Sequence, residues 1–318
     1  MGYGDYAFWS AIVRDMYLEV NNQKIIEKKI KKIAKYNKNY NKYKDNFGVI
    51  GCKKDSDTDN FKIYINIISH QNTVLAESIF EHVQSKEIFK NNPYVTIDLS
   101  YPNLIYLNIF SSGYFVVNNG RKTYFDSQHV MEYYANRIGL TKFNIHVDLH
   151  FTKEEEEKVK ENLPNEEFIY VEPQSYKPGR SYNFNKIQNI VNHFKNNIKF
   201  IQISPSIFAG RKANVLENVN MYVDKFTFRE AILFASYSKF CLLPHGGLSN
   251  CLSFCHKKTI VTYSCLFDPI MTCFKNEVPI WVNSPDHIKC YNQHCNLNPI
   301  LMKNHDENII INKIKDLL

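Results

Sequence analysis

The sequence predicts an α/β protein with a parallel β-sheet in its C-terminal half. From Glu167 onward, short apolar or β-branched runs alternate with segments of helical periodicity. One of these runs, Phe240–Leu243, leads into a Gly-Gly turn and the start of a helix rich in small residues. The chain has 318 residues and is 44% hydrophobic, so it can build two cores rather than one.

The C-terminal elements follow one another with short connections. We expect strands at Phe168–Val171, Phe200–Ile203, Asn220–Val223, Phe240–Leu243 and Thr259–Tyr263, and helices at Asn185–Phe194, Phe228–Tyr237, Leu248–Cys255 and Glu307–Leu318. We place the domain boundary near Leu163–Glu167, which gives domains 1–164 and 165–318. The last helix could pack on either domain, including the N-terminal one.

The N-terminal half is less regular. It predicts helices at Tyr6–Val20, Thr73–Val83, Asp126–Ile138 and Phe151–Asn162, and strands at Lys62–Ile68, Tyr94–Leu99, Leu104–Phe110 and Phe143–Leu149. Asp126 or Ser127 would cap the third helix, and Gly139 would end it. Thr152 followed by several glutamates suits the positive end of the fourth helix.

The charge of +7 is concentrated in one segment. Between residues 22 and 45 there are nine lysines and two acids, which accounts for the whole excess. The remainder is balanced, so we do not expect a nucleic-acid partner. A solvated surface is the simpler interpretation of this Lys-rich 22–45 segment, and peripheral contact with an anionic surface is the alternative.

Other compositional features favour a cytoplasmic protein. No apolar run reaches the roughly 20 residues that span a bilayer, and Met1–Asp5 lacks a basic signal-peptide region. Seven of the eight cysteines lie between Cys241 and Cys295, several inside apolar patterns. We interpret them as buried thiols in a reducing compartment.

The segment Pro244–Asn250 (Pro-His-Gly-Gly-Leu-Ser-Asn) is the strongest candidate for a ligand site. It follows a buried strand and therefore lies at the carboxyl edge of the parallel sheet, where ligands bind. Two glycines would let the backbone approach a phosphate, toward which the N–H groups of Leu248, Ser249 and Asn250 would point. The alternative is a simple tight turn with Ser249 as the helix cap.

A second loop, Glu172–Arg180, follows the strand Phe168–Val171 and should lie at the same edge. Its two cations, Lys177 and Arg180, could neutralise a diphosphate. They could equally be exposed charges on a polar loop.

Two further groups of residues are weaker candidates. Asp5 stands where a helix begins, so it is either a cap or a general base. His287, Cys290, His294 and Cys295 have the ligand atoms that zinc prefers, but no CxxC occurs and the spacing is not that of a zinc finger. We therefore expect no metal site. The absence of GxGxxG, Walker A, HExxH and GxSxG patterns removes the usual support for dehydrogenases, kinases, zincins and α/β-hydrolases.

Several segments together resemble glycosyltransferase family 9, the ADP-heptose:lipopolysaccharide heptosyltransferase-like family. They are Gly2–Asp5 opening a helix, Phe168–Pro173 ending a strand, Thr227–Ala231, and Leu243–Asn250. Their order and spacing match over most of the chain. The Pro244–Asn250 loop is also similar to that of the EGF-domain O-GlcNAc transferase type.

The resemblance implies a GT-B fold, in which two Rossmann-like domains face a cleft. The C-terminal domain would bind a nucleotide-sugar donor and the N-terminal domain a glycan or glycolipid acceptor. Transfer would be inverting and independent of metal, with no resident cofactor. Asp5 would deprotonate the acceptor. The donor would be bound by Glu172, Lys177, Arg180, His245, Gly246, Gly247, Leu248, Ser249 and Asn250, with Lys177 or Arg180 balancing the charge of the leaving group.

The chain departs from the family pattern at two places. The family has a strand before its Gly-Asp loop, whereas this chain begins inside the loop, so we expect the first N-terminal strand to be missing or supplied by another segment. His245 precedes the glycines and Asn250 holds the later position, so donor identity does not transfer. A non-catalytic GT-B-like protein that binds glycan or nucleotide, or a nucleotide-sugar epimerase, are the alternatives.

Overall fold

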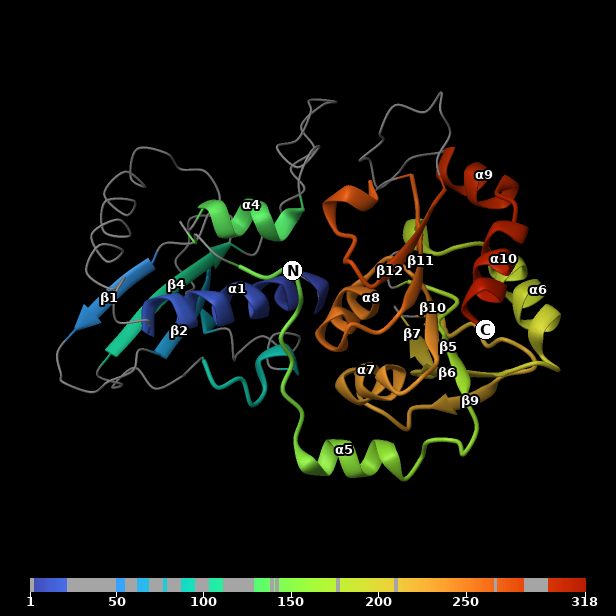
Figure 1. The fold of residues 1–318 in the computed structure, drawn as a ribbon, viewed down its shortest axis with the longest axis horizontal. Helices are drawn as coiled ribbons and strands as arrows, with labels where there is room; N and C mark the ends of the chain where they lie inside the picture. Colours follow the sequence, from blue (N-terminus) through green and yellow to red (C-terminus); the bar gives the residue numbers. More distant parts are fainter. Residues whose placement is uncertain are drawn as a thin grey trace. The chain divides into compact units, whose positions relative to one another are not determined.

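The chain divides into two compact units in the computed structural model (Figure 1). The N-terminal unit comprises Met1–Val116 and Gln128–His150, and the C-terminal unit comprises Val117–Ser127 and Phe151–Leu318. The structure describes residues 3–21, 50–54, 62–68, 77–78, 87–94, 103–110, 129–137, 140, 143–175, 178–208, 211–265, 268–282 and 297–318. The Lys-rich 22–45 segment lies outside these residues.

A six-stranded parallel sheet forms the centre of the C-terminal unit. Its order is β12-β11-β10-β5-β6-β9. The strands are β5 (Phe168–Val171), β6 (Lys199–Ser204), β9 (Asn220–Val223), β10 (Phe240–Pro244), β11 (Thr259–Tyr263) and β12 (Glu277–Trp281). The parallel α/β prediction for this half is confirmed, and the predicted bounds of β5, β9 and β11 match those observed.

Helices cover both faces of this sheet (Figure 1). On one side lie α6 (Phe184–Phe194), α9 (Leu297–Asn304) and α10 (Asn308–Leu317), and on the other lie α7 (Phe228–Ser236) and α8 (Gly247–Cys251), which continues as the 3-10 helix η2 (Leu252–Cys255). Ile187 and Ile190 of α6 and Ile310 and Ile314 of α10 are buried in one core with the strands. The last helix is therefore part of the C-terminal core.

Four C-terminal strands and helices were not predicted from the sequence, apart from short 3-10 turns. They are β12, α9, and β7 (Ile207–Phe208) and β8 (Arg211–Lys212), which form a small hairpin. β12 contains Pro279 and pairs on one side only, with β11. Proline cannot donate to a second neighbour, so it is tolerated on such an edge strand although it obscures the strand pattern.

Helix α5 (Lys153–Lys160) belongs to the C-terminal unit, so the division falls at His150–Phe151, ahead of the Leu163–Glu167 region that we expected. Thr152 caps α5 in a capping box with Glu155, as its sequence predicts. Glu155 also accepts two hydrogen bonds from Arg229 of α7, Nε–Oε1 at 2.9 Å and Nη2–Oε2 at 3.0 Å. This buried pair fixes α5 to the C-terminal unit.

The N-terminal unit contains a mixed sheet rather than the parallel sheet that a Rossmann-like domain implies. The described strands β1 (Ile50–Lys54), β2 (Lys62–Ile68), β3 (Glu77–Ser78) and β4 (Asn103–Phe110) are ordered β1-β4-β2-β3. Only the pair β2–β4 is parallel. All of these strands follow α1 (Tyr3–Asn21) in the chain, and Phe8 and Ile12 of that helix are buried.

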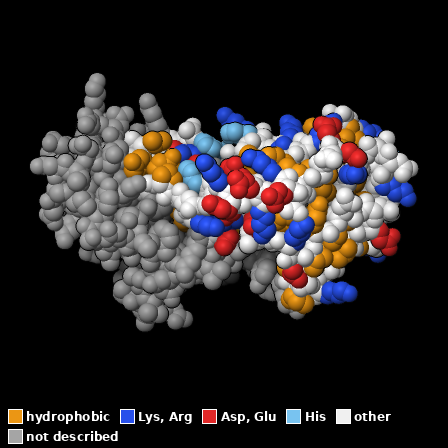
Figure 2. All heavy atoms as spheres, turned by 90° about the horizontal axis from the view of Figure 1, so that it is seen from below, with side chains coloured by type: hydrophobic (Ala, Val, Ile, Leu, Met, Phe, Trp, Pro, Cys, Tyr) orange, Lys and Arg blue, Asp and Glu red, His pale blue; other side chains and the backbone are white. Residues whose placement is uncertain are grey.

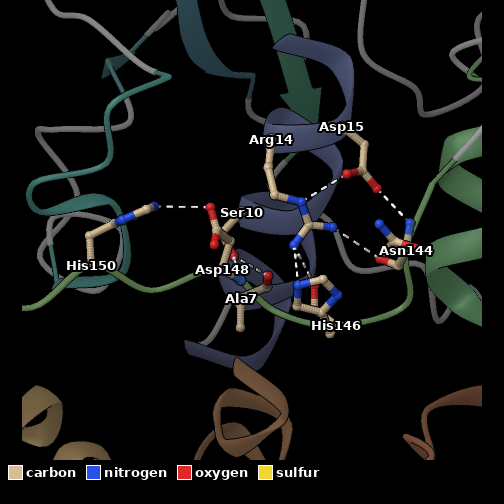
Figure 3. A network of polar contacts seen from close by, with 8 residues as sticks. All are labelled: Ala7, Ser10, Arg14, Asp15, Asn144, His146, Asp148 and His150. Carbon is tan, nitrogen blue, oxygen red and sulfur yellow. Dashed lines mark hydrogen bonds and ion pairs between the residues drawn. The ribbon is translucent and has the colours of Figure 1, made fainter. Parts of the chain in front are cut away.

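Residues 143–149, predicted as a strand, have no strand structure and are held by side chains of α1 instead (Figure 3). Arg14 donates to the Asn144 carbonyl at 3.3 Å and approaches His146 Nε2 at 2.7 Å. Asp15 accepts from the Asn144 N–H at 2.6 Å. Since Arg14 can only donate, His146 must be a neutral ring with its hydrogen on Nδ1. These bonds satisfy backbone groups that a sheet would otherwise pair.

Three further N-terminal predictions need correction or lie partly outside the described residues. Within Thr73–Val83, the described Glu77–Ser78 form β3 and not a helix. Tyr94 lies in a turn, and the rest of Tyr94–Leu99 is outside the described residues. Helix α4 is Val130–Arg137, and the His129 ring just before it accepts from the Met131 N–H at 3.2 Å. The predicted caps Asp126 and Ser127 lie outside the described residues.

The surface carries both signs of charge. Figure 2, seen from the side on which α5 lies, shows acidic and basic side chains interspersed over the described face. Among the described residues, no helix is long and apolar enough to cross a membrane. Cys241, Cys251 and Cys265 are buried free thiols, and burial raises the pKa of Cys241 to about 12, as inert core cysteines require.

Candidate functional site

The glycine loop lies at the carboxyl edge of the parallel sheet, as predicted. β10 is buried along its whole length and ends at Pro244. The His245 N–H then donates to the Thr262 carbonyl of β11 at 3.0 Å, and the Asn250 N–H donates to the Gly246 carbonyl at 3.1 Å, which starts helix α8. The turn is therefore held at both ends by backbone hydrogen bonds.

Helix α8 has no side-chain cap. α5 and α7 are capped by the hydroxyls of Thr152 and Thr227, whereas the N-cap of α8 is Gly246, which has no side chain. Ser249 Oγ accepts from the Gly246 N–H at 3.0 Å and donates to the Gly246 carbonyl at 3.1 Å, so this hydroxyl is bonded to the N-cap backbone. The N–H groups of that turn lack the acceptor that a capping residue supplies. An external anion could take this place.

No described protein atom requires glycine at position 246. Its backbone is extended, with φ of 174°. A Cβ placed there would meet Ser175 Oγ at 3.5 Å, an ordinary contact. Gly246 therefore differs from other residues mainly in two ways: it supplies no side-chain cap to α8, and it leaves the backbone accessible to a ligand.

The second predicted loop meets the glycine loop. The Glu172 N–H donates to the Leu242 carbonyl of β10 at 3.1 Å, and Ser175 is the nearest neighbour of Gly246. The loop ends in the 3-10 helix η1 (Pro178–Arg180). Arg180 lies close enough to His245 for its charge to contribute to lowering the pKa of that imidazole, after burial as the larger cause. The structure thus brings Glu172, Arg180 and the glycine loop together, while Lys177 lies outside the described residues.

Glu172 is an unusual carboxyl group. It is buried beside Tyr170 at the end of β5, and this desolvation raises its pKa to about 8, against the opposing effect of a hydrogen bond from the Gln174 N–H. At neutral pH the carboxyl is therefore protonated, and it can donate a hydrogen bond as well as accept one.

Three buried polar atoms at this edge have no hydrogen-bond partner among the described residues. They are Gln174 Nε2, Ser204 Oγ and Asn250 Oδ1. Ser204 is the last residue of β6, and Gln174 and Asn250 come after the ends of β5 and β10. Buried polar atoms are normally paired, so their presence together indicates that a polar ligand or water completes the site. Sequence reasoning missed Gln174, Ser175 and Ser204, although their positions at or just after the ends of strands were a usable signal.

The His245 side chain faces inward. The residue is 3% exposed. Its ring stacks on that of Tyr263 with centroids 4.7 Å apart, and its Nε2 lies 3.0 Å from Thr272 Oγ1. Burial lowers the pKa of this imidazole well below its ordinary value, so the ring is neutral. The described contacts of His245 thus hold its ring against Tyr263 and Thr272, and the donor contact that we expected of it stays a prediction.

The remaining candidates stay predictions. Asp5 lies within the first turn of α1, and its side chain is outside the described part of the chain, as are His287, Cys290, His294 and Cys295. Among the described residues, no group of His, Cys, Asp and Glu is arranged to hold a metal ion.

Comparison with known proteins gives structural likenesses only. No protein-family profile matches the chain, and no curated protein matches its sequence. The similar solved structures include a family 9 glycosyl transferase from Veillonella parvula DSM 2008, with 11% identity, a TM-score of 0.47 and coverage of 62% of each chain.

Two others are heptosyltransferases of E. coli. ADP-heptose LPS heptosyltransferase II has 10% identity and a TM-score of 0.41, with 54% of this chain and 53% of that chain covered. WaaC, solved with ADP, has 14% identity and a TM-score of 0.43, with 63% and 59% covered. In all three cases the match spans less than two thirds of the solved chain.

Proposed function

We propose that this protein is a glycosyltransferase that transfers a sugar from a nucleoside diphosphate sugar to a hydroxyl group of a glycan or glycoconjugate. The observation that carries the proposal is the uncapped glycine loop beside Arg180, at the carboxyl edge of a parallel sheet. Backbone N–H groups and a guanidinium suit a diphosphate, since both favour anionic oxygens.

The proposed chemistry needs a leaving group, a base and an acceptor. The anomeric carbon–oxygen bond to the diphosphate breaks as the acceptor oxygen attacks from the opposite face, which inverts the configuration. Asp5 takes the acceptor proton, and Lys177 and Arg180 stabilise the charge that develops on the diphosphate. On this proposal no divalent cation is needed, so activity should persist in EDTA. The Asp5 and Lys177 roles follow from the family resemblance described above.

The hydroxyl-bearing part of the donor would meet the buried polar atoms at the same edge. Gln174 Nε2 donates, Asn250 Oδ1 accepts, and Ser204 Oγ does both. A protonated Glu172 adds one more group that can donate or accept. This mixture suits hydroxyl groups, each of which is both donor and acceptor.

A nucleotide-binding screen tests the proposal. ADP, UDP and GDP are added in thermal-shift experiments, and at least one should raise the melting temperature. Gly247→Asp places a carboxylate at the first turn of α8, and Arg180→Ala removes the cation, so each should abolish or strongly reduce the shift. Lys313→Ala, an exposed cation on α10, is the matched control and should leave the shift intact. Absence of any shift in the wild type would refute the proposal.

Catalysis needs its own measurement. Asp5→Asn should retain the nucleotide-induced thermal shift and lose transfer of sugar to an acceptor. Turnover of donor in the absence of any acceptor, followed by NMR, would show an epimerase instead. Nucleotide binding with no turnover under either condition would leave a binding protein.

A further inference from the structure

A group of buried polar side chains packs against the glycine loop. Tyr263, at the end of β11, donates from its hydroxyl to Glu277 Oε2 at 2.7 Å. The Phe274 N–H approaches the same oxygen at 3.3 Å. Tyr263 stacks on His245, with an angle of 18° between the rings, and His245 Nε2 meets Thr272 Oγ1. All of these side chains except that of Phe274 are polar or titratable, and all are buried.

This group of buried side chains contacts His245, the residue that precedes the two glycines of the loop. The His245 backbone is tied to Thr262, its ring plane is set by Tyr263, and rotation of the ring is limited by the bond to Thr272. Tyr263 is held in turn at its far end by Glu277. Gly246 follows His245 directly, so displacement of the imidazole would displace the N-cap of α8.

We infer that Glu277, Tyr263 and Thr272 are positioning residues that hold the glycine loop in the conformation that binds the diphosphate. The identity of the ligand rests on the proposed function, whereas the role of these three residues in holding the loop rests on the contacts described above. Binding groups must be held to a fraction of an ångström by their neighbours, and a glycine-containing loop has little rigidity of its own.

The protonation state of Glu277 provides a discriminating substitution. Burial raises the pKa of Glu277 to about 8, so its carboxyl is neutral at pH 7, with Tyr263 and Cys273 as the titratable groups that face it. Glutamine has the same shape as a protonated glutamate and keeps the carbonyl oxygen that accepts from Tyr263. Glu277→Gln should therefore keep the wild-type hydrogen exchange in residues 245–250 and the wild-type nucleotide affinity, and Glu277→Leu should lose both.

Amide hydrogen exchange of the ligand-free protein tests the support directly. Tyr263→Phe keeps the ring but loses the hydroxyl, and Thr272→Val keeps the shape but loses the bond to His245. Both should raise exchange in residues 245–250 by roughly tenfold, with little change across β5 and β6. Tyr182→Phe is the matched control, because it also removes a buried hydroxyl, in its case one bonded to His305 at 2.7 Å. It should leave exchange in residues 245–250 unchanged.

Affinity for whichever nucleoside diphosphate the screen identifies gives the second readout. Loss of one hydrogen bond in the support should raise the dissociation constant by roughly two- to tenfold in Tyr263→Phe and Thr272→Val, and not in Tyr182→Phe or Glu277→Gln. Unchanged loop exchange in both variants would overturn the inference, even if nucleotide binds. Faster loop exchange with unchanged affinity would also overturn it. Failure of the wild type to bind any nucleotide would refute the proposed function, while the exchange result would still decide whether these residues support the loop.

Discussion

Glu172 follows strand β5, and Glu277 is the first residue of strand β12 in the same sheet. Both carboxyl groups are buried, and burial raises the pKa of each from 4.5 to about 8. In the unfolded chain both would ionise near the ordinary value. Below about pH 4.5 both states are protonated and neither group affects stability. Between about pH 4.5 and 8 only the unfolded state loses its protons, so each group's contribution to stability falls as the pH rises.

We therefore expect Glu172→Gln and Glu277→Gln to gain stability relative to the wild type as the pH is raised from 5 to 8. The upper limit is about 1.4 kcal/mol per pH unit for each carboxyl. Urea denaturation at several pH values measures the difference between variant and wild type, which cancels the titration of other groups. Glu217→Gln, at an exposed position, should show no such trend. A constant difference from pH 5 to 8 would contradict the prediction.

At the scale of single residues, the sequence predicted which residues lie at the same edge of the sheet, but not the direction or the environment of their side chains. The positions of Glu172, Arg180 and Gly246 follow from strands that end at a common edge, a rule of parallel sheets. The packing of the His245 ring depends on Tyr263, which is 18 residues away in the sequence, and the raised pKa of Glu172 depends on its burial in the folded unit. No local pattern encodes such contacts.

Among the elements, α5 and α7 are joined by the pair Glu155–Arg229, with side chains 9% and 1% exposed. Arg229 also lies over the Phe151 ring, 4.7 Å from its centroid. Arg229→Met would leave the Glu155 carboxylate buried without its partner, which typically costs about 3–5 kcal/mol. The double variant Arg229→Met with Glu155→Leu removes both charges and should recover most of that loss.

Urea denaturation of the single and double variants measures both effects. Lys160→Met breaks the exposed pair with Glu156 and is the control, for which we expect little change. Equal stabilities of Arg229→Met and the double variant would show that the unpaired charge is not the cause.

The elements also show where sequence patterns are informative. Strands β5, β9 and β11 are short, apolar and flanked by turns, and their bounds were predicted correctly. β12 was missed because Glu277 and Pro279 interrupt its apolar pattern, although both are tolerated at the edge of the sheet. Residues 143–149 alternate like a strand, but Arg14 and Asp15 satisfy their backbone through side chains. Long-range pairing, which a local pattern cannot report, decided both cases.

At the scale of the whole molecule, the described contacts of the proposed donor site all lie in the C-terminal unit. We expect the active nucleoside diphosphate to slow hydrogen exchange in residues 172–175 and 245–252, and to leave exchange in β2 and β4 unchanged. At a ligand concentration 100 times the dissociation constant, the stabilisation is about 2.7 kcal/mol. Protection confined to the N-terminal unit would contradict the assignment of the donor site.

Gly246, the N-cap of α8, supplies no side-chain hydrogen bond to the first turn of that helix. A bound anion would finish that piece of secondary structure, so binding and local folding would be a single event there. A Cβ at this position would meet only ordinary contacts, so we expect that a serine there could supply the missing cap. The same hydroxyl would then compete with the anion. On the proposed function, the stability of the free protein and its affinity for the anion would therefore place opposite demands on this residue.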